Sequence, residues 1–278
     1  MLPAIPWLVQ AGIAAIASYG GYVYYDENVK GVEGTFKIYQ LKFDLNMNIY
    51  GQTEALNALV NNLVSGLHQN HASVIILCGG TGVGKTLALS RIRENYEPSK
   101  MVVSLLQQDL SSLSSMDQVK KLARVSGLGL VTIDNADINS SELWVFMSRL
   151  NGFCTMNRIQ VKVLVAAQLF QDVKSSDSAK NLISNSFRNI DKYVNYVKEK
   201  NKNACSKYTN CRVVMFKPIS IDTVKMCINA AAKRLSGVAL KEEQVATLVE
   251  QISESGLDYV PGGCKSVDNY VALLQDGL

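Results

Sequence analysis

The sequence has little that points to a metal centre or to nucleic acid. Only two of its 278 residues are histidines, and its six cysteines form neither a CxxC zinc pattern nor a dense disulfide scaffold. The formal net charge of +4 is too slight to argue for nucleic acid, and no basic stretch is interleaved with aromatic residues. We therefore expect no nucleic-acid partner and no zinc site built from histidines and cysteines.

Charge is missing altogether from the start of the chain. No charged side chain precedes Asp26, and the apolar run from Ile5 to Tyr25 is about long enough to cross a bilayer. The triplet Ala15-Ile16-Ala17 resembles a processing site, but the basic region that a cleaved signal needs is absent. The pattern favours a membrane-associating segment in residues 1–25, in which residues 5–25 are embedded in a membrane or lie on it. A cleaved signal and a buried helix are the less favoured alternatives.

A phosphate-binding loop is the most specific local pattern in the chain. Gly79, Gly84, Lys85 and Thr86 fit G-x-x-x-x-G-K-[ST], with an apolar strand before the loop and helix-forming sequence after it. That context argues against a glycine-rich turn that matches by chance. Backbone N–H groups and the helix dipole would bind the phosphates of ATP, Lys85 would neutralise their charge, and Thr86 would ligate Mg²⁺. The expected cofactor-binding residues are Gly79, Gly80, Thr81, Gly82, Val83, Gly84, Lys85 and Thr86.

Strand-like and helix-like stretches alternate after this loop, which predicts an α/β fold with the nucleotide at the carboxyl edge of a parallel sheet. From residue 219 onward only helical patterns remain, as expected for a small lid domain. The expected strands are Val74 to Cys78, Met101 to Leu105, Leu128 to Asp134, Val161 to Ala167 and Val213 to Phe216. The expected domains are a membrane segment (1–25), a linker (26–45), a large nucleotide-binding domain (46–218) and a helical lid (219–278).

The strand from Leu128 ends in Asp134, a carboxylate that could hold the Mg²⁺ shell through water. In ATPases of this architecture a glutamate follows and polarises the attacking water, but here the next residue is Asn135. An amide cannot accept a proton, so general-base assistance is at risk. Asp137 is a candidate to replace that base through a water molecule.

A basic stretch follows the fourth expected strand. Gln171 to Arg212 contains nine Lys or Arg residues against four Asp or Glu residues. This composition fits a solvated helix and loop, and it also fits an interface with an acidic partner or a neighbouring subunit.

Four further stretches, spread over nearly the whole chain, form a specific set. They are Gly21-Tyr22-Val23-Tyr24, Tyr50-Gly51-Gln52, Lys225-Met226-Cys227-Ile228 and Gly263-Cys264-Lys265-Ser266-Val267. The set resembles the torsins, Clp/Hsp100-related AAA+ ATPases of the endoplasmic reticulum and nuclear envelope. The resemblance implies an AAA+ three-layer αβα sheet with a helical lid, ATP and Mg²⁺ as cofactors, and self-association in a ring or filament.

The resemblance also implies roles for residues of the lid. Lys265 would reach the γ-phosphate, and Cys227 and Cys264 would form a redox-sensitive disulfide that couples the lid to the nucleotide. Two buried structural cysteines remain the alternative. The sequon Asn139-Ser140-Ser141 is consistent with an oxidising lumen.

Catalytic residues depart from the torsin pattern more than binding residues do. Torsins usually carry Asn where this chain has Thr86, and the sensor-1 asparagine is missing, with Gln168 as a possible substitute. No arginine finger precedes Phe216-Lys217-Pro218; torsins also lack one and take it from a membrane-anchored luminal activator. We expect a chaperone-like or remodelling ATPase that is slow or needs an activator, with Asp134, Asn135 and Lys265 at the catalytic centre. The alternative is a nucleotide-binding scaffold that does not hydrolyse ATP.

Overall fold

The computed structural model describes residues 35–65, 71–97, 101–124, 128–167, 195, 199, 205, 210–253, 259–260 and 262–276, and the structural statements that follow concern these residues. The apolar segment of residues 1–25, Gln168 and most of the basic stretch lie outside them. Within the described part of the chain, no helix combines the length and the apolar character needed to cross a membrane.

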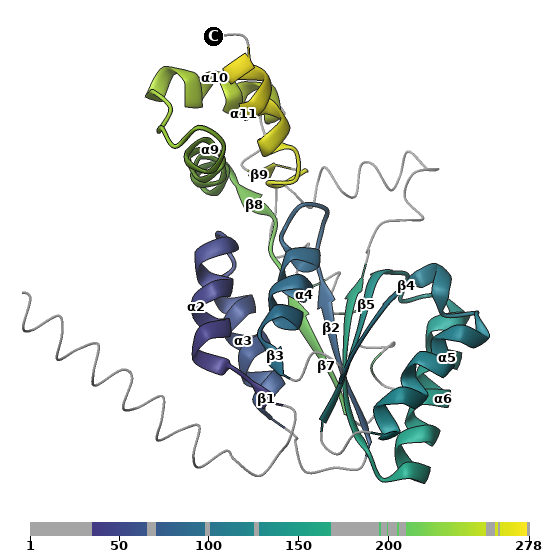
Figure 1. The fold of residues 1–278 in the computed structure, drawn as a ribbon. Helices are drawn as coiled ribbons and strands as arrows, with labels where there is room; N and C mark the ends of the chain where they lie inside the picture. The colour runs from purple at the N-terminus through teal and green to yellow at the C-terminus, as the bar shows by residue number, and fades with distance from the viewer. Residues whose placement is uncertain are drawn as a thin grey trace, which may run out of the picture.

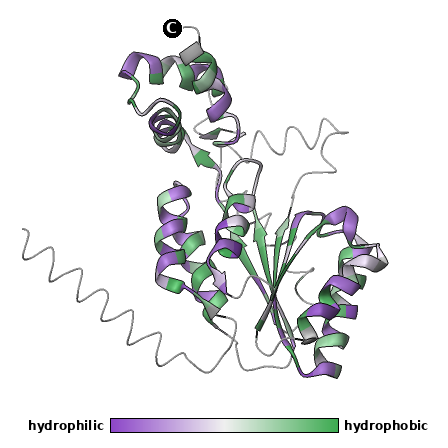
Figure 2. Cartoon of the chain, viewed as in Figure 1, coloured by the Kyte–Doolittle hydropathy of each residue, from purple (hydrophilic) through white to green (hydrophobic). Residues whose placement is uncertain are grey.

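A five-stranded parallel sheet forms the centre of the molecule (Figure 1), in the order β4-β5-β6-β2-β7. Its strands are nearly continuous apolar runs, as expected when both faces are covered. Figure 2 shows this apolar character as green strands between helices of mixed colour. The strands are β2 (Ala72–Cys78), β4 (Val102–Leu106), β5 (Leu128–Ala136), β6 (Gln160–Ala167) and β7 (Cys211–Met215).

Helices cover the two faces of this sheet. On one face α3 packs against β7, and α4 packs against β5 and β6, with α2 outside them; on the other, α5 packs against β4 and α6 against β2. The three-layer αβα architecture predicted from the sequence is therefore confirmed. The helices are α2 (Ile38–Asn48), α3 (Thr53–Val64), α4 (Lys85–Glu94), α5 (Leu113–Lys120) and α6 (Ser141–Asn157), with 3-10 turns at Gln107–Asp109 and Lys121–Arg124.

The predicted linker of residues 26–45 is wrong in its second half, because α2 begins at Ile38. This helix buries Leu41 and Leu45 against α3 and α4. The two leucines and Ile49 recur every four residues, a helical period.

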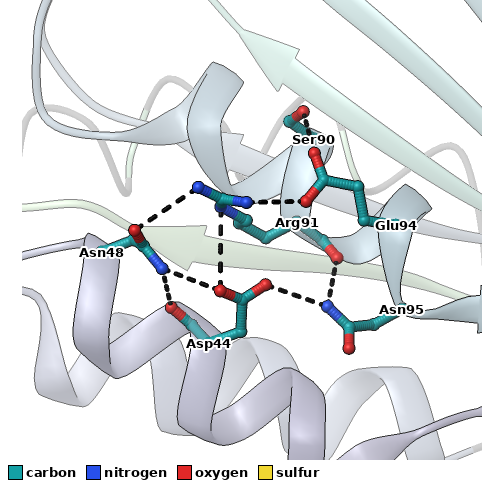
Figure 3. Close-up of polar contacts among 6 residues, drawn as sticks. All are labelled: Asp44, Asn48, Ser90, Arg91, Glu94 and Asn95. Carbon is teal, nitrogen blue, oxygen red and sulfur yellow. Dashed lines mark hydrogen bonds and ion pairs between the residues drawn. The ribbon is translucent and has the colours of Figure 1, made fainter.

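A polar cluster fixes how α2 sits on α4 (Figure 3). The Asp44 carboxylate accepts hydrogen bonds from Asn48 Nδ2 at 2.7 Å and from Asn95 Nδ2 at 3.0 Å. Arg91 lies beside it, with Nε 3.8 Å from Asp44 Oδ1 and Nη1 2.7 Å from Glu94 Oε2. These contacts hold α2 against α4 and set the rotation of α2 about its axis, while the buried Arg91 Nε makes only the long ion pair and no hydrogen bond among the described residues.

The lid follows β7 and lies above the carboxyl edge of the sheet (Figure 1). Its helix α9 packs against both α10 and α11. A short antiparallel ribbon, β8 with β9, ties the start of the lid to the turn before α11. The elements are β8 (Ile219–Ser220), α9 (Ile221–Ser236), α10 (Glu242–Ile252), β9 (Tyr259–Val260) and α11 (Val267–Asp276); a second ribbon pairs β1 (Thr35–Phe36) with β3 (Tyr96–Glu97).

Two disulfides are present among the described cysteines. Cys227 is bonded to Cys264 within the lid, and Cys205 is bonded to Cys211 at the start of β7. The second pair was not anticipated, since cysteines six positions apart match no pattern considered in the sequence. Cys78 and Cys154 are buried and belong to neither disulfide.

Candidate functional site

The phosphate loop connects the end of β2 to the start of α4 and needs glycine at two points. Gly82 has a φ of 71° and Gly84 a φ of 103°, in the left-handed region that other residues rarely adopt. A Cβ on Gly84 would lie 2.8 Å from the Ile49 side chain. The loop conformation and its close neighbours therefore both exclude side chains here.

Lys85, the first residue of α4, turns its side chain back over the loop. Its Nζ donates hydrogen bonds to the carbonyl oxygens of Gly79 at 2.8 Å and Gly80 at 2.5 Å. Burial lowers the pKa of Lys85 from its usual 10.5 to about 8, although Asp134 nearby opposes the shift. The ammonium is thus held in a largely buried place whose natural counter-charge would be a phosphate.

Thr86 and Asp134 meet at the mouth of the loop. Thr86 Oγ1 donates a hydrogen bond to Asp134 Oδ1 at 3.1 Å, which joins α4 to the end of β5. A hydroxyl and a carboxylate side by side fit Mg²⁺, which prefers oxygen ligands and keeps several waters. These two residues could hold the ion beside a triphosphate.

A bulge in β5 brings two consecutive residues into the same cavity. Neighbours on a strand normally point to opposite faces, but the register of β5 with β6 shifts between Ile133 and Ala136. Asn135 has a φ of 58°, and its N–H donates to Asp134 Oδ1 at 2.8 Å. Asparagine tolerates this left-handed conformation better than most residues, so the backbone gives one reason for an asparagine at the position of the usual glutamate.

The structure does not bring Asp137, the suggested replacement for the missing base, to the cavity. Asp137 is not among the residues that line the cavity. Its Oδ1 accepts the backbone N–H of Asn139 at 2.8 Å, closing the turn after β5. The carboxylate is directed to this local turn because α6 begins immediately afterwards.

The turn that carries Lys265 rests directly on the phosphate loop. The backbone N–H of Cys264 donates to the Gly82 carbonyl at 3.1 Å. A Cβ on Gly82 would lie 1.8 Å from the Gly262 carbonyl oxygen, so the two backbones approach as closely as glycine allows. The Cys227–Cys264 disulfide fastens the same turn to α9, with Cα atoms 6.0 Å apart.

These groups line one cavity of about 1000 Å³ between the sheet and the lid. The expected binding, catalytic and redox residues lie on its wall, whereas of the two suggested substitutes Asp137 is not among the lining residues and Gln168 lies outside the described residues. The wall includes the whole loop from Gly79 to Thr86, Asp134, Asn135, Cys227, Cys264 and Lys265. The volume lies in the range of ligand-binding pockets. Two lysines, 180 positions apart in the chain, thus face a common space.

Sequence reasoning missed several wall residues. Ile49 packs against Gly84, and Ile219 contributes from the first strand of the lid. Arg93 donates to Ser104 Oγ at 3.3 Å. Ile49 directly precedes the Tyr50-Gly51-Gln52 motif and could have been found there. Besides Tyr50, the further wall residues are Asn48, Ile49, Leu87, Ser90, Arg93, Ala166 and Ile219.

The Tyr50-Gly51-Gln52 motif connects this cavity to the hinge before the lid. The buried Gln52 amide donates to the Lys217 carbonyl at 2.8 Å and accepts the Lys217 N–H at 2.9 Å. A Cβ on Gly51 would lie 2.8 Å from Thr223 Oγ1 of α9. The motif therefore touches the nucleotide side, the hinge and the lid at once.

No protein-family model matches the sequence, and no curated protein matches it. Solved structures do match the fold. A DNA replication initiation factor is 14% identical with a TM-score of 0.50, covering 85% of this chain and 64% of its own. The Hsp104-ADP complex of S. cerevisiae is 15% identical with a TM-score of 0.51, covering 87% and 40%.

The replication initiator DnaA, bound to AMPPCP and single-stranded DNA, is 14% identical with a TM-score of 0.50, covering 84% of this chain and 65% of its own. This chain therefore spans less than two thirds of each of these proteins. At such low identity the likeness concerns the fold. Together with the strand order, the phosphate loop and the helical lid, it establishes that the chain has the AAA+ P-loop fold.

Proposed function

We propose that this protein is a torsin-like, membrane-associated AAA+ ATPase of the endoplasmic reticulum and nuclear envelope lumen. It uses Mg·ATP to remodel proteins or membranes, hydrolyses ATP slowly, and depends on a membrane-anchored luminal activator. It self-associates in a ring or filament and contacts lipid through residues 5–25. The fold supports nucleotide binding, and the torsin motifs support the rest of the proposal.

One observation carries this proposal. Lys85 of the loop and Lys265 of the lid line the same cavity, together with Thr86 and Asp134. A triphosphate in that space would place negative charge between two cations that belong to different domains. Binding of ATP would therefore favour the closed lid, as the torsin resemblance implies for Lys265.

The disulfides support the luminal location. Both described disulfides need an oxidising compartment to persist. Cys227 and Cys264 are the pair that the torsin resemblance implies, and both line the cavity. We propose that their oxidation state sets how the lid turn rests on the phosphate loop.

The residues divide the work of the site in a simple way. Lys85, Lys265 and the loop N–H groups would bind the phosphates, and Thr86 and Asp134 would hold Mg²⁺, which would supply charge stabilisation when bound. Asn135 orients water through its amide but cannot accept a proton. An arginine from the activator would stabilise charge in the transition state, an effect of about 10³–10⁵ in rate when supplied in trans.

Nucleotide binding and turnover of the full chain in vesicles test the proposal. We expect Lys85→Ala to abolish ATP binding and Lys265→Ala to weaken it at least about tenfold, since each removes a phosphate-directed cation. Lys233→Ala is the control, because Lys233 is an exposed lid lysine outside the cavity. Unchanged affinity in Lys265→Ala, or no stimulation of phosphate release by any luminal arginine-bearing domain under saturating Mg·ATP, would count against the proposal.

The position of Asn135 favours a second candidate, a scaffold that binds ATP without turning it over. Asn135→Glu restores a base and should raise hydrolysis by about 10²–10⁴ if the base is all that is missing. Asn135→Gln is the matched control, because it imposes the same left-handed strain without a carboxylate. If only Asn135→Glu hydrolyses ATP, the natural protein binds ATP without hydrolysing it. If both variants and the natural chain hydrolyse ATP at equal rates, another group already acts as the general base.

A further inference from the structure

A stripe of large apolar side chains faces outward along α2. Tyr39, Phe43 and Met47 recur every four residues and are 51%, 68% and 57% exposed. At about 1.5 Å per residue they form one continuous row of about 12 Å on a single helix face. Single exposed apolar residues are common on protein surfaces and need no explanation. A contiguous row of them is unusual and is typical of a contact surface.

The packing of α2 against the rest of the protein keeps this apolar face pointing outward. Leu41 and Leu45 occupy the opposite side of the helix and are fully buried. Asp44 is held toward α4 by Asn95 and Arg91, so the helix cannot roll inward to cover the stripe. In Figure 1, α2 is an outermost helix, on the side of the sheet opposite α5 and α6.

The charges around the stripe suit a phospholipid surface. The exposed residues of α2 include one cation, Lys42, and no carboxylate. The only acidic residue of the helix, Asp44, is occupied at the interface with α4. Glu97 of β3 is paired with Lys37, the residue that precedes the helix, at 2.7 Å. Aromatic and apolar side chains flanked by lysine are typical of helices that lie in the headgroup region.

The sequence upstream places this face within reach of a membrane. The uncharged apolar run ends at Tyr25, and Ile38 follows 13 positions later. A chain of that length spans at most about 45 Å. If the apolar run is in a bilayer, α2 is therefore tethered close to the same surface.

We propose that α2 docks on the bilayer, with Tyr39, Phe43 and Met47 inserted at the headgroup boundary and Lys42 near lipid phosphates. This inference rests on the membrane association in the proposed function but adds a second contact, in the AAA+ domain itself. Anchored at α2, the domain has a fixed orientation relative to the membrane. The lid and the nucleotide cavity then face a defined direction.

A local fluorescence probe in the full chain tests this. Phe43→Trp is placed in vesicles of phosphatidylcholine with a minor share of phosphatidylserine, with and without lipid brominated on its acyl chains. The wild type, which contains Trp7 and Trp144, supplies the background to subtract. Met156→Trp is the matched control, because Met156 is 85% exposed on α6, against the other face of the sheet.

We expect brominated lipid to quench about half of the emission added by Phe43→Trp and none of that added by Met156→Trp. Adding Lys42→Glu should reduce the quenching on anionic vesicles. A blue-shifted emission without vesicles overturns the proposal: it means a second copy if it depends on protein concentration, or another part of the chain if it does not. Flotation of the protein with vesicles but no quenching also overturns it, while leaving the membrane association of the proposed function intact.

Discussion

At the scale of single residues, the site is held ready for an anion. The Lys85 ammonium lies against two loop carbonyls, and its partial burial lowers its pKa to about 8. The backbone also determines the setting of Asn135, because the bulge that turns this residue into the cavity requires a left-handed backbone conformation. In both cases the side chain and its backbone setting have to be considered together.

The pKa of Lys85 predicts how ATP affinity depends on pH. In the free protein this lysine loses its proton above about pH 8, whereas bound phosphates would raise its pKa again. Binding above that pH must therefore take up a proton, and affinity should fall by up to about tenfold per pH unit there. Below about pH 8 the lysine is already charged, and its contribution to affinity is constant.

Calorimetric titration in buffers of different ionisation enthalpy measures this proton uptake directly. Lys162→Met serves as the control, because burial also lowers the pKa of Lys162 to about 8 but that residue lies outside the cavity. The uptake should persist in this variant. An affinity that stays flat from about pH 7 to about pH 9.5 would contradict the prediction.

At the scale of elements, the decisive contact is between the phosphate loop and the lid turn. Gly82 and Gly262 approach through bare backbone, and the Cys264 N–H completes the contact. Gln52 adds a second link by pairing both backbone groups of Lys217 at the hinge. Movement of the lid should therefore change the loop conformation, because the two backbones are in direct contact at Gly82.

Gly82→Ala should lift the lid from the loop even without nucleotide, because the added Cβ would overlap the Gly262 carbonyl. We expect the Cys227–Cys264 disulfide to be reduced several times faster, on the order of fivefold, as the turn loses its support. Thiol labelling after timed exposure to reductant measures this rate. It also avoids relying on ATP affinity, which the loop change alters directly.

Two glycines provide matched controls for this experiment. Gly237 also has a positive φ, 74°, but a Cβ there meets nothing within 4 Å, so Gly237→Ala reports the backbone strain alone, about 1–2 kcal/mol. Gly262→Ala places a methyl group on the lid side, where a Cβ also meets nothing within 4 Å. Equal reduction rates in all three variants would show that the loop does not support the turn.

At the scale of the whole molecule, one disulfide belongs to the cavity and the other does not. Cys227–Cys264 lines the cavity, whereas Cys205–Cys211 joins two residues six positions apart at the start of β7 and does not line it. The two disulfides can therefore be compared within one protein to test the proposed redox control of ATP binding. Only the first can change the lid turn that carries Lys265.

Reduction should lower ATP affinity by about three- to tenfold, because the turn carrying Lys265 loses its attachment to α9. The variant Cys205→Ser with Cys211→Ser should keep this response, and Cys227→Ser with Cys264→Ser should bind like the reduced protein under both conditions. Titration of Mg·ATP under oxidising and reducing conditions measures it. The same redox response in both double variants would assign the effect to general destabilisation.

The sequence alone determined the elements whose physics is local. Apolar runs predicted the core strands to within a few residues, and the phosphate loop was specified by glycines that its backbone needs at Gly82 and Gly84. Asp134 could be placed at a strand end for the same reason. The helix α2 was missed because three of its apolar residues face outward and obscure the inward period of Leu41 and Leu45.

Only the tertiary structure decided what depends on contacts between distant parts of the chain. It placed Lys265 and Lys85 on one cavity, and it placed the Asp137 carboxylate in a local turn outside the residues that line the cavity. It also showed that Gly82 contacts the backbone of the lid turn and that the apolar stripe of α2 is exposed. Side-chain direction after a bulge and backbone contact across a hinge depend on packing between elements, which no local pattern of residues encodes.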